Sequence, residues 1–150
     1  MAKRYWLMKT EPDTFSIDDL ERVGTEPWTG VRNFTARNFM RDQMQVGDTV
    51  LFYHSSCAVP GVYGEAKVSS PSYPDPTQFD AKSEYYDKRA STEKPLWFLV
   101  DVEFVRKLDV PYTLAQMRAN KELVEMVTLE PGSRLSVTPV TPEEAREILG

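Results

Sequence analysis

The sequence predicts an α+β fold, a small mixed β-barrel of about five or six strands with short peripheral helices. Short apolar segments with strand-like periodicity occur along the whole chain, and short helix signals separate them irregularly. This order lacks the βαβ rhythm of a doubly wound sheet. A glycine-rich phosphate loop is also missing, because Pro60–Gly64 is too short and wrongly spaced.

Length and composition predict a single domain over residues 1–150. A chain of this size buries roughly 70% of its unfolded surface without disulfides. The lone Cys57 excludes an internal disulfide, and one histidine is too few for a protein-only zinc or iron site, so we expect no metal and no cofactor. Apolar runs are too short to cross a bilayer, and the N-terminus lacks the apolar core of a signal peptide. We expect a cytoplasmic protein, or a nuclear one in a eukaryote.

The N-terminal segment predicts a strand followed by a helix. Arg4–Lys9 is rich in aromatic and aliphatic residues, which is typical of a strand, and Glu11–Asp13 with its central proline ends it. Ser16, with the acidic Asp19 three positions later, resembles a capping box. We therefore expect a short helix that ends near Arg22.

A second helix is expected from Asn33, a good N-cap residue, to about Asp42. Positions four apart share one face of a helix, so Arg37 and Arg41 would follow Asn33 along one side. The buried side of this helix would carry Phe34, Phe39 and Met40.

The middle of the chain predicts two strands and a long loop. Gln45–Asp48 is a turn, and Thr49–Tyr53 after it is apolar enough to be a strand buried on both faces. Val62–Val68 predicts the next strand. Residues 69–94 are polar and interrupted by prolines, which predicts a long structured loop, and such loops are usually functional or mobile.

The C-terminal part predicts two more strands and two helical regions. The clearest strand is Leu96–Val105, where alternate residues would form two faces. Residues 113–127 have helical character in one or two pieces, and residues 134–140 predict a last strand. Thr141-Pro142-Glu143-Glu144 supplies an N-cap threonine, a proline at the first helical position and a glutamate at the third, so a helix is expected to start there.

The segment from Trp28 to Arg41 gives the first indication of function. It holds three arginines, two asparagines and three aromatic residues and no acidic residue, although the whole chain has a formal net charge of -5. Arginines bind phosphate, asparagines read base edges and flat rings stack on bases. An acidic chain disfavours non-specific nucleic-acid binding, but a local patch and a pocket suffice to read one nucleotide.

Two clusters raise the question of catalysis. A serine or cysteine hydrolase is disfavoured, because His54 and its neighbour Ser55 would point to opposite faces of a strand and no nucleophile elbow is present. Lys9 and Thr10 at a strand end could instead form a small amidohydrolase site, with Lys9 as base or nucleophile and Glu11 or Glu65 as acid/base. From the residues alone, a solvated ion pair at a strand end is the simpler interpretation.

Aromatic residues beside polar residues or near element ends are candidates for a ligand cage. For any single one, core or rim packing is the simpler interpretation, so the hypothesis of a cage rests on their number. These candidates are Trp6, Trp28, Tyr53, Tyr85, Tyr86 and Trp97.

From Tyr5 to Leu149 the chain resembles the EVE domain family. The matching motifs, in chain order, are Tyr5–Pro12, Trp28–Asn33, Ala36–Phe39, Phe52–Ser56, Tyr73–Pro76, Tyr85–Asp87, Trp97, Val100–Val102 and Arg134–Val137. So many separated motifs in the right order are far more specific than one short pattern. Thr10 stands where many relatives have serine, and the hydroxyl is kept.

The resemblance implies a PUA-like β-barrel, similar to the YTH domains that read methylated adenosine in RNA. It implies a pocket at one end of the barrel that receives a flipped, modified base, with Arg32 in the place of a YTH tryptophan. Arg37 and Arg41 would contact phosphate. The ligand-binding residues implied are Lys9, Thr10, Glu11, Trp28, Arg32, Asn33, Asn38, Tyr53, His54, Ser55, Ser56 and Trp97.

The leading hypothesis is therefore a non-catalytic reader of a modified nucleobase, such as a methylated cytosine or adenine, in DNA or RNA. A buried methyl group adds only roughly 0.8 kcal/mol, so methylation alone gives modest selectivity. We expect modified DNA or RNA as the partner and no membrane. The alternatives are the amidohydrolase, acting on a modified nucleoside, and a module that binds a protein partner through residues 69–94.

Overall fold

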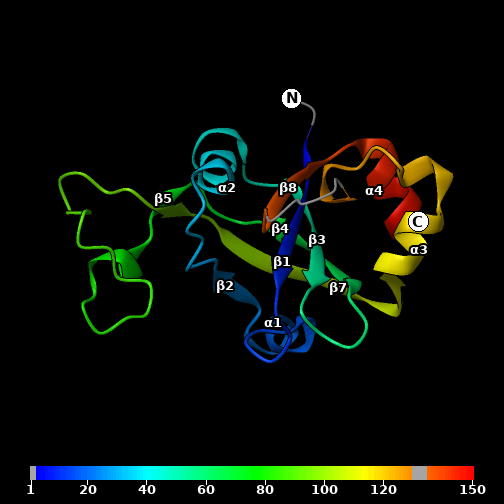
Figure 1. The fold of residues 1–150 in the computed structure, drawn as a ribbon, viewed down its shortest axis with the longest axis horizontal. Coiled ribbons are helices and arrows are strands. Elements are labelled where there is room, and N and C mark those ends of the chain that lie inside the picture. The colour runs from blue at the N-terminus through cyan, green and yellow to red at the C-terminus, as the bar shows by residue number, and fades with distance from the viewer. Residues whose placement is uncertain (1–2, 130–134) are drawn as a thin grey trace.

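The computed structural model describes residues 3–129 and 135–150. Its main sheet has the strand order β2-β7-β4-β3-β1-β8, in which β1 and β3 are parallel and every other pair is antiparallel (Figure 1). The strands of this sheet are β1 (Tyr5–Thr10), β2 (Thr25–Pro27), β3 (Thr49–His54), β4 (Gly61–Val68), β7 (Asp101–Thr113) and β8 (Val137–Val140). The predicted fold class, a small mixed β-barrel of five or six strands with short peripheral helices, is confirmed, and its six-stranded sheet curls into a half-barrel.

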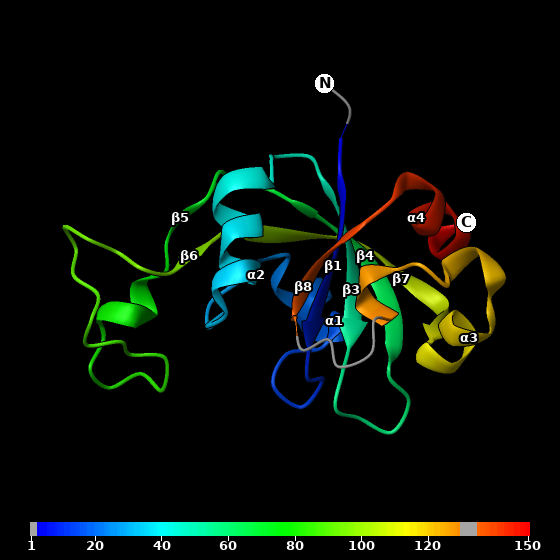
Figure 2. The ribbon, with the colours of Figure 1, turned by 45° about the horizontal axis from the view of Figure 1, so that its top comes forward.

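Short helices and a second, two-stranded sheet surround the main sheet. The helices are α1 (Ile17–Val23), α2 (Phe34–Asn38), α3 (Leu114–Ala119) and α4 (Pro142–Leu149). A π-helical turn, η1 (Phe39–Gln43), continues α2, and three 3-10 turns follow later, η2 (Pro76–Phe79), η3 (Lys121–Leu123) and η4 (Val127–Leu129). The small sheet pairs β5 (Tyr73–Pro74) with β6 (Phe98–Leu99). Figures 1 and 2 place the segment between β5 and β6 at one end of the molecule and α3 and α4 at the other.

The central strands are buried on both faces, as the apolar run at Thr49–Tyr53 predicts. All six residues of β3 are buried. Along β1, Trp6 and Met8 belong to one core cluster and Leu7 to another, on the opposite face of the sheet. Irregular pairing within β3–β4 and β4–β7 marks β-bulges, which bend strands and so favour a curled sheet.

The predicted helix starts are confirmed. They could be predicted because an N-cap depends on residues that are close in the sequence. Ser16 and Thr141 each form a capping box at the N-terminus of α1 and α4. Asn33 Oδ1 accepts the backbone N–H of Ala36 at the start of α2, at 3.0 Å. A π-helical turn was not expected in this helix, and it moves the residues after Asn38 out of the regular spacing of four.

The strand predicted as Leu96–Val105 is wrong in its extent. Gln78, which is fully buried, accepts the backbone N–H groups of Leu96 and Trp97 through Oε1, at 2.9 Å each. These N–H groups are therefore bound by a side chain, and the first paired residues are in β6. Val100 separates β6 from β7, which then runs to Thr113. The alternation of faces across residues 96–105 is lost at this break.

Other differences are smaller. The three-residue strand β2 was not expected. The predicted last strand, residues 134–140, corresponds to β8, and Arg134 lies outside the described residues. Throughout residues 3–129 and 135–150, the model contains no helix long and apolar enough to cross a membrane.

Candidate functional site

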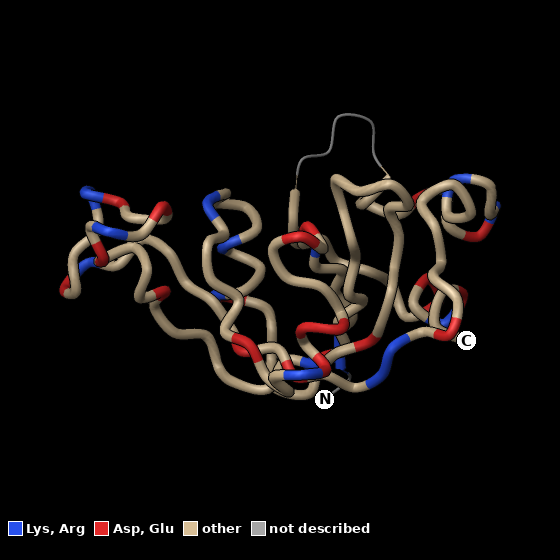
Figure 3. Tube along the Cα trace, turned by 90° about the horizontal axis from the view of Figure 1, so that it is seen from below, with Lys and Arg blue, Asp and Glu red and all other residues tan. Residues whose placement is uncertain are grey.

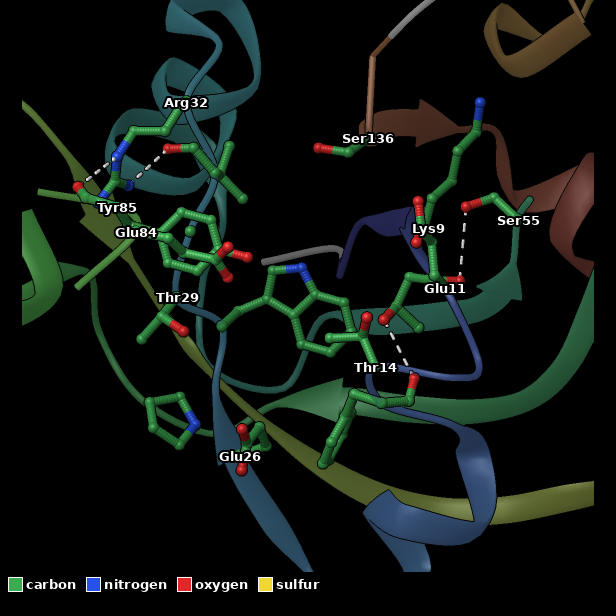
Figure 4. Close-up of a pocket in the computed structure, with 16 residues that line it drawn as sticks. Lys9, Glu11, Thr14, Glu26, Thr29, Arg32, Ser55, Glu84, Tyr85 and Ser136 are labelled. Atoms are coloured by element: carbon green, nitrogen blue, oxygen red, sulfur yellow. Dashed lines mark hydrogen bonds between the residues drawn. The ribbon is translucent and has the colours of Figure 1, made fainter. Parts of the chain in front are cut away.

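A cavity of about 700 Å³ opens where the ends of β1, β2 and β3 meet the segment around Tyr85. This volume is typical of a small-molecule or nucleotide site. Figure 4 shows that its side chains come from all sides, with Lys9 and Ser55 opposite Arg32 and Tyr85. The lining residues are Lys9, Thr10, Glu11, Thr14, Phe15, Glu26, Pro27, Trp28, Thr29, Gly30, Val31, Arg32, Ser55, Glu84, Tyr85 and Ser136.

One wall is the end of the parallel pair β1–β3. Thr10 pairs with His54, and the backbone N–H of Ser55 donates to the carbonyl of Thr10 at 2.9 Å. The Thr10 hydroxyl donates to the carbonyl of Phe15 at 3.0 Å, so it fastens the loop before α1 to the strand end. Lys9 Nζ lies 5.6 Å from the centre of the Tyr53 ring, and burial lowers the pKa of this lysine.

Trp28 is the largest side chain that lines the cavity. Its backbone N–H donates to the carbonyl of Val100 at 3.1 Å, which extends the β2–β7 pairing by one residue. The indole meets the rings of Phe52 and Phe15 edge to face, at centroid distances of 5.6 and 6.5 Å. These two contacts hold the indole in one orientation.

The opposite wall depends on Arg32. Its guanidinium donates to the carbonyl of Tyr85 at 2.7 Å, to Asp75 Oδ2 at 3.1 Å and to Thr77 Oγ1 at 3.1 Å. It also lies 5.4 Å from the centre of the Tyr85 ring. Arg32 therefore lines the cavity, but its donors already hold the wall in place, which limits its freedom to stack on a base.

The remaining predicted residues of the Arg-rich segment do not line the cavity. Asn33 caps α2 through Oδ1, and Asn38 accepts two hydrogen bonds from the Arg37 guanidinium. Arg37 also donates to the carbonyl of Leu96 at 2.8 Å, and Arg41 pairs with Asp42 at 2.8 Å. In Figure 3 basic and acidic residues are interspersed over most of the molecule. Arg37 is on α2, and Arg41 is on η1. A phosphate-contacting role for Arg37 and Arg41 stays a prediction.

Tyr53, His54, Ser56 and Trp97 also lie outside the lining, for different reasons. Tyr53 belongs to the second core cluster, on the face of the sheet away from Trp28. His54 is buried and accepts the backbone N–H of Ile17 through Nε2 at 3.1 Å, so it positions α1. Ser56 is an exposed turn residue with a positive φ of 54°. Trp97 stacks on Phe34 at 4.6 Å and binds Asp87 through its indole N–H.

Of the residues expected for the amidohydrolase, Lys9, Thr10 and Glu11 line the cavity, but Glu65 lies apart from them. Glu65 pairs with Arg106 at 2.9 Å and lines a different, smaller cavity beside Lys3 and Tyr5, at the start of β1. Lys9 lies at the other end of β1, roughly 13 Å along the strand from Tyr5. The Thr10 hydroxyl, expected as a partner of Lys9, is bound to Phe15. Within the described ranges, no group of three or more His, Cys, Asp or Glu residues could hold a metal ion.

Sequence reasoning missed several residues of the site. Glu26 is half-buried on β2, and burial raises the pKa of its carboxyl. Glu84, Thr14, Thr29 and Ser136 line the cavity from loops. The signal for Glu26 was its place two residues before Trp28, because alternate residues of an extended segment share a face. The loop residues gave no such signal.

The matching family model is the EVE domain, which covers residues 4–150. This chain belongs to the EVE domain family. Thymocyte nuclear protein 1 of Mus musculus is 39% identical over 163 residues, which span 97% of this chain and 72% of the mouse protein.

Solved structures of EVE relatives have the same fold. A hypothetical protein from Leishmania major has a TM-score of 0.94 at 49% identity, over 99% of this chain and 93% of that one. Human THYN1, solved in complex with 5-methylcytosine-containing DNA, has a TM-score of 0.91 at 37% identity, over 97% and 95% of the two chains.

Proposed function

We propose that this protein is a non-catalytic reader of a modified base in DNA, with 5-methylcytosine as the base to test first. The observation that carries the proposal is the likeness to human THYN1 in complex with 5-methylcytosine-containing DNA, at 37% identity over almost the whole of both chains. The cavity of about 700 Å³ beside Trp28 and Tyr85 is large enough for one base.

The energetics of a flipped base fit such a cavity. Extruding a base from a duplex costs a few kcal/mol, which stacking and edge hydrogen bonds must offset. Stacking on an aromatic side chain contributes about 1–3 kcal/mol per base. Tyr85 supplies a ring for such stacking, because it lines the cavity and is held beside the Arg32 guanidinium. An acidic protein with net charge -5 must depend on this cavity more than on phosphate contacts.

Three further expectations from the sequence stand beside this proposal. RNA with a modified base is a second ligand class, and it is tested by the same assay with matched RNA strands. A cytoplasmic or nuclear location, and a protein partner at residues 69–94, are proposals of the sequence alone. Part of that segment forms the cavity wall through Glu84 and Tyr85, which favours a role in the site.

The test is fluorescence anisotropy with labelled duplexes that differ only in one cytosine or 5-methylcytosine, at one fixed low salt concentration. We expect tighter binding of the methylated duplex and no new nucleoside by mass spectrometry. Tyr85→Ala should weaken that binding about tenfold, because a base loses one stacking partner. Tyr86→Ala is the matched control, since Tyr86 is 46% exposed and does not line the cavity.

Equal affinity for the two duplexes, or equal effects of the two tyrosine variants, would contradict the proposal. Release of a new nucleoside that disappears in Lys9→Met would instead favour the amidohydrolase.

A further inference from the structure

The indole N–H of Trp28 stands apart from those of the two other tryptophans. Trp6 Nε1 donates to Asp48 at 3.0 Å, and Trp97 Nε1 donates to Asp87 at 2.9 Å. Trp28 is 6% exposed and lines the cavity, yet its Nε1–H has no acceptor within residues 3–129 and 135–150. A buried N–H without an acceptor is costly, so this donor is suited to a ligand acceptor.

Glu26 and Trp28 lie on the same side of one extended segment, which consists of β2 and the residue after it. The β2–β7 register pairs Glu26 with Val102 and Pro27 with Asp101, and the hydrogen bond from Trp28 to Val100 continues it. Residues two apart in such a segment project to one face, roughly 6.7 Å apart. The Glu26 carboxylate is half-buried, and no side chain in the described part of the chain donates to it. Burial without a nearby cation raises the pKa of this carboxyl.

We propose that Glu26 and Trp28 together read the edge of the flipped base, so that the cavity accepts 5-methylcytosine and rejects thymine. The Glu26 carboxylate accepts a hydrogen bond from the exocyclic amino group of cytosine, and the Trp28 indole N–H donates to a ring or carbonyl acceptor on the same edge. The inference rests on the proposed function, because it names which bases that site takes.

The discrimination is chemically necessary for a reader of 5-methylcytosine. Thymine carries the same methyl group at the same ring position, so contacts to the methyl group cannot separate the two bases. They differ at the neighbouring ring position on the Watson–Crick edge, where cytosine offers an amino donor and thymine a carbonyl acceptor. A carboxylate at that edge binds the first and repels the second, because a site built for a donor rejects a base that lacks it.

Two other carboxylates line the cavity, but both are exposed. Glu11 follows the end of β1, and Glu84 lies in the loop between β5 and β6. Figure 4 shows the three glutamates on separate sides of the cavity, with Glu26 far from the ammonium group of Lys9. Glu26 is placed on a strand, and a rigid element holds a recognition group more accurately than a loop. It is therefore the carboxylate that the geometry favours.

The test compares oligonucleotide duplexes with 5-methylcytosine or thymine opposite an abasic site. Neither base is then paired, so the cost of flipping is similar for both and edge recognition dominates. We expect the wild-type protein to favour 5-methylcytosine by about tenfold or more. Glu26→Gln should bring the two affinities to within about threefold, because an amide both donates and accepts.

Glu21→Gln is the matched control. Glu21 is exposed on α1 and does not line the cavity. Both substitutions remove one negative charge, which by itself strengthens DNA binding. If Glu26→Gln binds the 5-methylcytosine duplex more weakly than the wild-type protein and Glu21→Gln does not, edge recognition is supported. Unchanged discrimination in Glu26→Gln would overturn the inference while methylation-dependent binding by the wild-type protein stands.

A second measurement needs no variant of Glu26. In ¹⁵N-labelled wild-type protein, the indole N–H resonance of Trp28, assigned by its loss in Trp28→Phe, should shift when the 5-methylcytosine duplex is added. The resonance of Trp6, bound to Asp48, should stay in place. If the wild-type protein binds the methylated duplex and the Trp28 resonance does not move, the inference fails independently of the proposed function.

Discussion

The guanidinium of Arg32 donates to the carboxylate of Asp75 at 3.1 Å and so joins the turn after β2 to the start of the 75–97 segment. Asp75 is 1% exposed and also accepts the backbone N–H groups of Gly30 and Thr77, at 2.9 and 2.8 Å. Arg32 in turn donates to the carbonyl of Tyr85. The ion pair therefore fixes a cavity wall that is built from two distant parts of the chain.

Asp75→Ala should destabilise the protein by about 3–5 kcal/mol, because it leaves the partly buried Arg32 guanidinium without its counter-charge. The measurement is urea unfolding followed by tryptophan fluorescence, with the midpoint and the slope compared. Asp109→Ala is the control, since Asp109 is exposed on β7, and its effect should stay within about 0.5 kcal/mol. A similar shift in both variants would mean that the ion pair is not important for stability.

Gly30→Ala should weaken ligand binding as well as stability. Gly30 has a φ of +88°, and a Cβ there would lie 2.6 Å from the Tyr85 ring, so the wall of the cavity must move. Gly47→Ala is a matched control, because Gly47 has a φ of +96° but nothing within 4 Å of the added Cβ. The measurements are the midpoint of thermal unfolding and the affinity for the methylated duplex, and both should differ between Gly30→Ala and Gly47→Ala.

We expect roughly 1 kcal/mol of destabilisation for Gly47→Ala, with unchanged binding, and a larger loss for Gly30→Ala. Identical unfolding midpoints and affinities for the two variants would show that Tyr85 moves aside without cost.

The sequence predicted those features that depend on neighbouring residues. The N-caps Ser16, Asn33 and Thr141 are defined by side chains that bond three residues ahead, so the starts of α1, α2 and α4 could be read directly. The start of β6 could not, because it depends on Gln78, which binds the backbone of Trp97 from 19 residues away. A three-residue strand such as β2 is too short for any periodic signal.

The same contrast between local and distant contacts explains which residues of the site could be predicted from the sequence. Lys9, Thr10 and Ser55 line the cavity because β1 and β3 are parallel and end side by side. The sequence predicted where both strands end, but it did not predict their parallel pairing. His54 is on the same strand end, but its ring accepts the backbone N–H of Ile17 at the start of α1. Nothing local to His54 shows that a helix 37 residues away uses its nitrogen.

The stability of the protein should fall as the pH is lowered through the titration of His54. Burial lowers the pKa of His54 below its ordinary value of 6.5. Asp18 raises this pKa and Lys107 lowers it, each by less than burial does. The unfolded chain then takes up the proton first, so the stabilisation is complete above pH 6.5 and is lost as the pH falls through the folded pKa. The measurement is the free energy of unfolding in urea from pH 8 to pH 5.

His54→Gln is the comparison, because glutamine can accept the Ile17 N–H without titrating. The chain has one histidine, so this variant should have a flatter profile in that range, whatever its absolute stability. If the free energy of unfolding of the wild-type protein and of His54→Gln changed with pH in the same way, a group other than His54 would cause the pH dependence.

Arg37→Ala should weaken binding of methylated and unmethylated duplexes equally. Arg37 does not line the cavity, and its guanidinium is held by Asn38, by the Leu96 carbonyl and 4.7 Å from the centre of the Phe34 ring. A positioned cation outside the cavity contributes through phosphate, which carries no sequence information. The slope of log K against log salt concentration should therefore become smaller by about one unit.

Arg22→Ala removes a cation of the same kind from α1, where the side chain is 69% exposed and pairs with Asp19. If Arg37 contacts phosphate, only Arg37→Ala lowers the salt slope, although both variants change the net charge equally. Arg37→Ala could instead lose the preference for the methylated duplex while the salt slope stays unchanged. Arg37 would then contact the base and not phosphate, because phosphate contacts set affinity and base contacts set sequence preference.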